Sequence, residues 1–177
     1  VESTYNWYWL VDGLMEAGFI VHLANTAAII QYEGLKYSDD NHDARWLAHL
    51  LRLGILKVGY IYPKEERSLR DLLRKRSQMV RQRTAQMLSI QNLYARNSAE
   101  RKTANQVRNM VAADIDQDTG EIHLNMAIKS NLAVFECIEE QVKQLEKEAL
   151  KCLQSNAQFC WLKSTPGIGK ILAMTIL

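Results

Sequence analysis

The sequence predicts an α/β segment at the start of the chain, followed by long helices. Short apolar runs alternate with helical patterns over residues 1–63, an alternation typical of a sheet covered by helices. Residues 64–97 contain neither Gly nor Pro, and their apolar side chains recur every seven residues, as in a coiled coil. A length of 177 residues, with 47% hydrophobic side chains, suits a folded protein of one domain or one and a part.

The first expected element is a helix that ends at Ala17. Ser3 and Thr4 are typical capping residues at its start, and Gly18 follows as a stop signal. The apolar run over residues 19–23 then predicts a short buried strand.

Further short elements complete the α/β segment. His22 lies inside the predicted strand, so we interpret it as a core histidine rather than a ligand. Asn25-Thr26 is expected to cap another short helix, which ends at Glu33-Gly34. Residues 55–62 predict a second strand or extended segment, ended by Pro63.

A helix that starts near Asp40 carries acids on the face that its pattern assigns to the core. Asp40 and Asp43 share this face with four apolar residues, Ala44, Leu47, Ala48 and Leu51. Carboxylates are rarely placed on a core face without compensation. Two explanations compete. In the first, Ser38, Asp39 or Asp40 caps the helix, and the positive end of the helix dipole stabilises the other acids. In the second, Asp40 and Asp43 bind a divalent metal ion.

Positive charge is concentrated in one part of the chain. The whole chain has a net charge of +2, but residues 64–110 hold twelve Lys or Arg against four acids, a net charge of +8. This segregation favours a polyanionic partner, with a solvated helix face as the alternative.

Other features exclude several classes of protein. The most apolar run, residues 18–30, is interrupted by polar residues, so neither a membrane span nor a signal peptide is expected. Cys137, Cys152 and Cys160 show no C-x-x-C spacing, which indicates free structural thiols in a reduced compartment. Because the chain starts on Val1 and stops at Leu177 within an apolar helical pattern, we expect an internal fragment of a longer protein.

Two long helices are expected to pack as an antiparallel hairpin. The first carries apolar residues at intervals of seven, Leu73, Val80, Met87 and Tyr94. Arg76 and Arg83 fall where this seam expects apolar side chains, so they weaken or specialise the pairing. After a turn over residues 112–121, the second helix presents its own stripe, Phe135, Ile138, Val142, Leu145, Ala149 and Cys152.

A Gly-rich turn, Pro166-Gly167-Ile168-Gly169, lies near the end of the chain. The residue after Lys170 is Ile171, so the Ser or Thr that a Walker A loop requires is missing. Between two apolar helical segments, the turn favours a helix-hairpin-helix whose backbone N–H groups meet a nucleic-acid phosphate. The alternative is a turn that simply joins two helices.

Several motifs follow one another in a familiar order. They are Glu2-Ser3-Thr4, Tyr8-Trp9, Asp40-Asn41-His42-Asp43-Ala44, Leu69-Arg70-Asp71-Leu72-Leu73-Arg74, Val80-Arg81-Gln82-Arg83-Thr84 and the turn at Gly167. Together they resemble the DEDD transposases of bacterial insertion sequences, the insertion-sequence one-ten family. The most specific part is the Glu, followed about forty residues later by Asp-x-x-Asp-Ala and then by the Arg-rich helix.

The resemblance implies three parts. They are a partial RNase H-like domain of the Holliday-junction-resolvase type over residues 1–63, a coiled-coil hairpin over 64–157, and the start of a helical transposase domain over 158–177. The implied activity is cleavage and rejoining of DNA strands in a mobile element, with Mg²⁺ or Mn²⁺ as cofactor.

Four acids bind metal in that family, and Glu2, Asp40 and Asp43 match the last three. Asp40 is preferred to Asp39 because it shares the face of Asp43. The first Asp and the serine nucleophile would lie outside the chain, so we expect this chain to be inactive alone.

The implied partners are DNA and a structured guide RNA, in the bacterial cytoplasm and at the nucleoid when bound to DNA. Residues expected to meet nucleic acid are Arg67, Arg70, Arg74, Arg81, Arg83, Gly167, Gly169 and Lys170. The coiled coil is expected to form a homodimer or higher homo-oligomer. Two other functions compete: a non-enzymatic adaptor that dimerises and binds nucleic acid by charge, and a metal-dependent junction-resolving nuclease that uses no serine.

Overall fold

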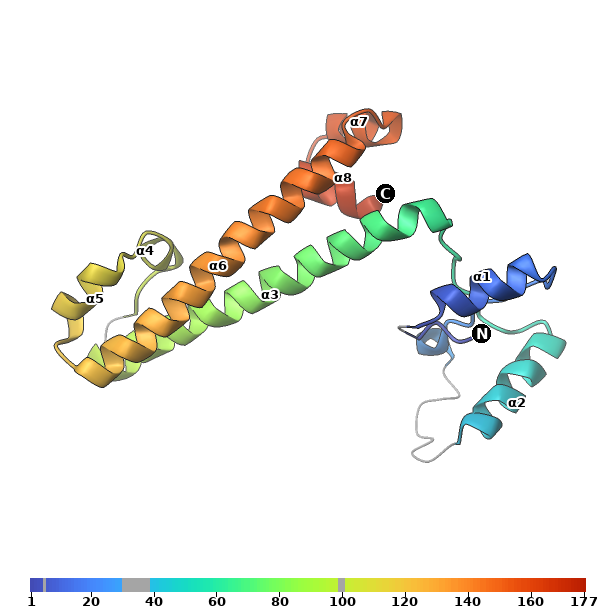
Figure 1. Cartoon of the computed structure of the whole chain (residues 1–177), viewed down its shortest axis with the longest axis horizontal. Coiled ribbons are helices and arrows are strands. Elements are labelled where there is room, and N and C mark those ends of the chain that lie inside the picture. Colours follow the sequence, from blue (N-terminus) through green and yellow to red (C-terminus); the bar gives the residue numbers. More distant parts are fainter. Residues whose placement is uncertain (5, 30–38, 99–100) are drawn as a thin grey trace. The chain divides into compact units, whose positions relative to one another are not determined.

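The computed structural model describes residues 1–4, 6–29, 39–98 and 101–177 (Figure 1). The chain divides into two compact units, Val1–Pro63 and Lys64–Leu177. Most of the described residues are helical. None of the helices in these ranges is long and apolar enough to cross a bilayer.

The first unit contains helices α1 (Tyr8–Glu16) and α2 (Asp40–Arg52) and a short 3-10 helix, η1 (Thr26–Ala28). Helix α1 begins later than the sequence predicts, because Ser3 is engaged elsewhere: its backbone N–H donates to the Ala24 carbonyl at 3.0 Å. The expected end of the second short helix at Glu33-Gly34 lies outside the described residues.

Among the described residues of this unit, backbone pairing between segments is limited to two isolated bridges. Glu2 forms a parallel bridge with Ala24, and Ala24 forms an antiparallel bridge with Val58. Next to the antiparallel bridge, the Gly59 N–H donates a hydrogen bond to the Leu23 carbonyl at 2.7 Å. No sheet forms among the residues described, which corrects the predicted strand at 19–23. Residues 55–62, predicted as a strand or an extended segment, contain no helix and pair only at Val58 within the described part of the chain.

The apolar side chains that indicated these strands lack a covering layer within the described unit. Phe19, Ile20, Ile55, Val58 and Tyr60 are all exposed. An apolar run predicts a buried strand only where other elements cover both of its faces. Here the paired segments are covered on one side, where Trp7, Val11 and Leu23 form a small core.

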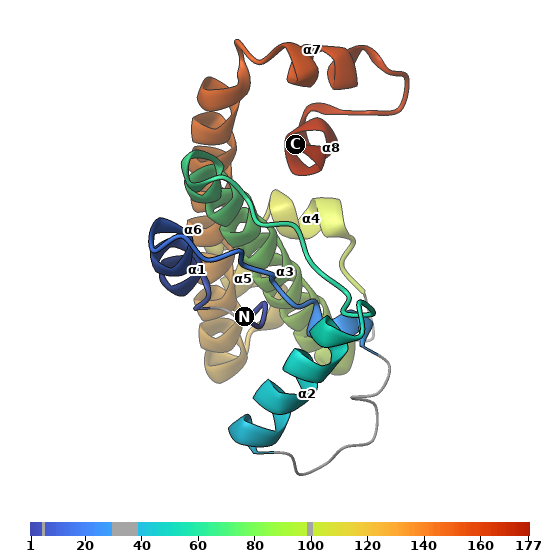
Figure 2. The ribbon, with the colours of Figure 1, turned by 90° about the vertical axis from the view of Figure 1, so that its right-hand side faces the viewer.

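Helices α3 (Lys64–Ser98) and α6 (Ile122–Leu153) dominate the second unit. They lie side by side over much of their length (Figures 1 and 2) and run antiparallel, since Arg76 contacts Glu146 while Arg83 contacts Glu139. The predicted helical hairpin is confirmed.

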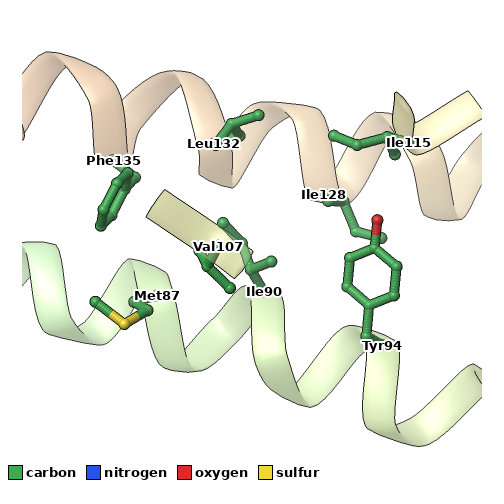
Figure 3. Packing of buried hydrophobic residues seen from close by; sticks show 8 residues of the cluster. All are labelled: Met87, Ile90, Tyr94, Val107, Ile115, Ile128, Leu132 and Phe135. Carbon is green, nitrogen blue, oxygen red and sulfur yellow. The ribbon is translucent and has the colours of Figure 1, made fainter. Parts of the chain in front are cut away.

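Two short helices, α4 (Ala104–Arg108) and α5 (Ala112–Thr119), fold back onto one end of the hairpin. Figure 3 shows the core that they close, which consists of Met87, Ile90, Tyr94, Val107, Ile115, Ile128, Leu132 and Phe135.

Helix α5 corrects the predicted turn at 112–121. The sequence there is rich in Asp, but Ile115 is fully buried in the core and anchors a helix. Asp116 and Asp118 are neutralised by Lys129 and Lys102, with N–O distances of 2.6 and 2.8 Å. The helix ends at Gly120, whose φ of +66° lies in the left-handed region that favours glycine.

Helices α7 (Ala157–Ser164) and α8 (Lys170–Ile176) cover the other end of the hairpin. Their core consists of Ala149, Leu153, Phe159, Ala173 and Met174, with leucines of α3 packed against it. Leu153, rather than the predicted Cys152, continues the apolar stripe of α6. All three cysteines are free and exposed, so they do not have the structural role that the sequence indicated.

Candidate functional site

A pocket of about 580 Å³ in the first unit collects the three acids that the sequence singled out. Glu2 reaches it from the paired segments, while Asp40 and Asp43 reach it from the first turn of α2. The remaining wall is largely apolar and includes Leu14, Phe19, Ile20 and Leu56. Side chains distant in the sequence therefore share one concave surface.

The predicted core face of α2 forms a wall of this pocket rather than a packed core. Ala44, Leu47, Ala48 and Leu51 line the pocket, and Leu51 is 44% exposed. The buried leucine of α2 is instead Leu50. The acids and the apolar residues do share a face, as the spacing predicts, but that face borders open space.

Capping of α2 is performed by the residue before Asp40. A carboxylate oxygen of Asp39 accepts a hydrogen bond from the backbone N–H of His42 at 2.7 Å. This is the side-chain to N3 contact of a typical N-cap. Asp40 and Asp43 follow in the first turn, where the positive end of the helix favours both carboxylates. The cap is thus satisfied without either of them.

Asp43 carries a polar atom without a partner. Its Oδ1 atom is buried, and no hydrogen bond to it occurs within the described part of the chain. A carboxylate oxygen that is buried without a hydrogen bond loses favourable interactions with water. The atom therefore favours a positively charged partner in the pocket.

Glu2 is held by the backbone. Its bridge to Ala24 is framed by two hydrogen bonds, from the Ser3 N–H to the Ala24 carbonyl at 3.0 Å and from the Ala24 N–H to the Val1 carbonyl at 2.7 Å. The Glu2 side chain lies half-buried on the pocket wall.

The interpretation of His22 as a core histidine is wrong. The residue is exposed and lines the same pocket as the three acids. The sequence pattern missed it because an apolar run does not show which of its faces will be covered. The pairing of Ala24 with Glu2 decides the face, and that pairing is a long-range contact.

The acids border the pocket without forming a ligand cluster. In the ranges that the structure describes, no three His, Cys, Asp or Glu side chains are grouped as a metal ion would require.

The predicted nucleic-acid arginines of α3 fall into different environments. Arg67 is buried, and Arg83 forms an ion pair with Glu139 of α6. Arg70 is partly buried beside Asp71. Arg74 and Arg81 are exposed and lie seven residues apart, so they share one face of the helix about 10.5 Å apart along its axis.

The glycine-rich turn joins α7 to α8, an arrangement that both the helix-hairpin-helix and the simple connecting turn predict. Gly167 has a φ of +87°, Gly169 precedes the first residue of α8, and Lys170 begins that helix. All three residues are exposed.

Comparison with known families gave a match over the pocket and most of α3. A family model described as a transposase, DEDD_Tnp_IS110, matches residues 1–96, which is more than half of the chain. No curated protein and no solved structure matched the chain in the other two comparisons.

Proposed function

The chain belongs to the IS110 family of DEDD transposases, and from this premise we propose that its acidic pocket serves metal-dependent cleavage and rejoining of DNA strands. Transposases move mobile elements, and DNA is therefore a partner of this family. The observation that carries the proposal is the shared position of Glu2, Asp40 and Asp43 on one pocket wall.

The pocket offers the oxygen atoms that a divalent cation prefers, although the acids are not grouped as ligands. DEDD transposases generally use such ions, and carboxylate oxygens are the ligands that Mg²⁺ and Mn²⁺ prefer. The buried, unpartnered Oδ1 of Asp43 gains a partner when a cation binds. Because the acids are not grouped as ligands without the ion, we expect binding to draw them together. A bound divalent ion would polarise the scissile phosphate and stabilise its developing charge.

The surrounding residues hold these acids in place. Asp39 caps α2 and so defines where its first turn begins, which sets the direction of Asp40 and Asp43. The backbone bridge to Ala24 positions Glu2 on a separate element.

We assign the contact with nucleic acid to exposed basic residues of the second unit. Arg74 and Arg81 present guanidinium groups on one face of α3 and are suited to phosphates of DNA or of a structured guide RNA. Arg70, Lys170 and the backbone at Gly167 and Gly169 are further candidates. Arg67 and Arg83 are buried or paired, so we assign them to the hairpin.

We also propose that the hairpin joins copies of the chain into a homodimer or a higher homo-oligomer. The support is an exposed apolar surface at the start of α6, where Ile122 is 79% exposed and Met126 is 70% exposed. Exposed apolar residues that recur along one helix face are suited to pairing with another helix.

Binding of a short DNA duplex tests the function directly. Without a cation, the acidic pocket repels phosphate, so Mg²⁺ at constant ionic strength should strengthen DNA binding several-fold. The Asp40→Asn/Asp43→Asn variant should bind DNA without needing Mg²⁺, because the repulsion is gone. Fluorescence anisotropy measures both. An equal effect of Mg²⁺ on the variant and the unaltered chain would contradict the proposal.

A second candidate is a non-enzymatic adaptor that binds nucleic acid through its basic helix. One observation favours it: no group of three metal-ligating side chains is assembled among the described residues. In that case DNA binding depends on Arg74 and Arg81, and neither Mg²⁺ nor the pocket acids affect it beyond general screening.

A further inference from the structure

The helical hairpin has two separate hydrophobic cores, one at each end. The tip core is the cluster of eight buried residues shown in Figure 3, which α4 and α5 close. The base core lies under α7 and α8 and consists of five buried residues, Ala149, Leu153, Phe159, Ala173 and Met174. No residue of the described chain belongs to both cores.

Between the two cores, α3 contributes no buried side chain. Within the described helix, Arg67 and Met87 are consecutive buried residues. The partly buried leucines of α3 that pack on the base core end at Leu73. Residues 74–86 therefore cover about 20 Å of helix without a core residue of their own. On α6, two buried residues of this section belong to neither core, Ile138 and Val142.

Ion pairs join the two long helices in this middle section. Arg76 pairs with Glu146 and Arg83 pairs with Glu139, at N–O distances of 2.7 and 2.5 Å. The Nε atom of Arg83 is buried and has no hydrogen-bond partner within the described chain. Charges that are removed from water lose hydration, which offsets much of the attraction between them. The middle section therefore aligns the helices but couples their two ends weakly.

The base core is the weaker of the two. It contains five buried residues against eight in the tip core, and the helices that cover it, α7 and α8, are only eight and seven residues long. The tip is held in addition by the ion pairs of Asp116 and Asp118 and by the capping box that Thr103 forms at the start of α4. Opening the base therefore requires less free energy than opening the tip.

We propose that the base of the hairpin opens as a unit of its own while the tip stays folded, with the ion-paired middle section as the joint. Opening separates α7 and α8 from the ends of α3 and α6. The glycine-rich turn at 166–169 connects α7 to α8, so it lies on the part that opens. Segments that move during binding are drawn from the least stable parts of a fold, and the base is such a part.

Native-state hydrogen exchange of the 177-residue chain, followed by mass spectrometry, tests the proposal. We expect the amides of α8 and of residues 149–153 to exchange at one common rate, because they open together. The amides around Ile90 and Ile128 in the tip core should exchange at least tenfold more slowly.

One substitution in each core shows whether the two ends are coupled. Phe159→Leu in the base core should speed exchange in α8 about fivefold and leave exchange around Ile90 unchanged. Ile128→Val in the tip core is the matched control, which should speed exchange around Ile90 and leave α8 unchanged. Circular dichroism checks that both variants keep their helices. If Phe159→Leu loses them, Ile168→Val at a partly buried position of the base core takes its place.

The inference is wrong if the hairpin opens as a single unit. In that case the base and tip amides of the unaltered chain exchange at one rate, and each substitution speeds exchange at both ends by the same factor. Faster exchange in the tip than in the base would also overturn it.

Discussion

Arg83 of α3 donates to Glu139 of α6 across the hairpin, with an N–O distance of 2.5 Å. Arg76 makes the equivalent pair with Glu146 at 2.7 Å. Seven residues separate the arginines and seven separate the glutamates, in opposite chain directions, so both pairs form together only in this antiparallel register. Each arginine side chain is 19% exposed, which limits screening by solvent. The arginines that interrupt the apolar seam therefore specify how the helices align.

Removal of Glu139 should destabilise the hairpin. Glu139→Ala leaves the largely buried charge of Arg83 without its partner, and we expect a loss of about 2 kcal/mol in the free energy of unfolding. Urea denaturation followed by circular dichroism measures the loss. Glu136→Ala is the matched control, because Glu136 is exposed on the same helix. Equal losses in both variants would contradict a specific role for the pair.

Ionisation of Tyr94 should lower the stability of the second unit at high pH. The pKa of the Tyr94 hydroxyl is raised from 10.0 to about 12. Burial is the largest cause, and the negative charge of Asp118 is the second. The folded state keeps the phenol proton longer than the unfolded state, so this contribution to stability is complete below about pH 10 and is lost as pH rises toward 12. Urea denaturation at increasing pH measures the loss.

Tyr94→Phe is the control for this pH dependence. The Tyr94 hydroxyl is buried near the carboxylate of Asp118 but forms no hydrogen bond of normal geometry within the described chain. Its removal should leave stability at neutral pH unchanged or slightly higher. The variant should also lose less stability than the unaltered chain between about pH 10 and 12. Parallel pH profiles for the two proteins would refute the assignment.

The hairpin and the acidic helix were predictable from the sequence, because local periodicity determines them. The seven-residue recurrence through Met87 and Tyr94 encodes the long helix, and the three-residue spacing of Asp40 and Asp43 places both on one face. The positions of His22 and Leu50 were not predictable. They depend on which neighbouring segments cover each face, and that information lies in contacts between residues distant in the sequence.

Arg74 and Arg81 should contribute to nucleic-acid binding through phosphate contacts. Arg74→Gln/Arg81→Gln should weaken binding of DNA or structured RNA irrespective of sequence and reduce the slope of log K against log salt by about one per arginine. The control is Lys143→Gln/Lys147→Gln, which removes the same charge from exposed positions on α6. Fluorescence anisotropy over a salt series measures the slopes. If the two variants show the same slope, Arg74 and Arg81 contribute only through their general charge and do not contact phosphates specifically.

The metal-dependent function depends on whether Glu2, Asp40 and Asp43 bind one divalent ion together. The most direct measurement is a calorimetric Mn²⁺ titration of the chain and of its Asp40→Ala/Asp43→Ala variant, with Asp12→Ala as a control on α1 outside the pocket. We predict saturable binding to the unaltered chain and to the control, and loss of binding in the double variant. Equal binding by all three proteins, or no binding by the folded unaltered chain, would contradict the metal site and leave the adaptor function.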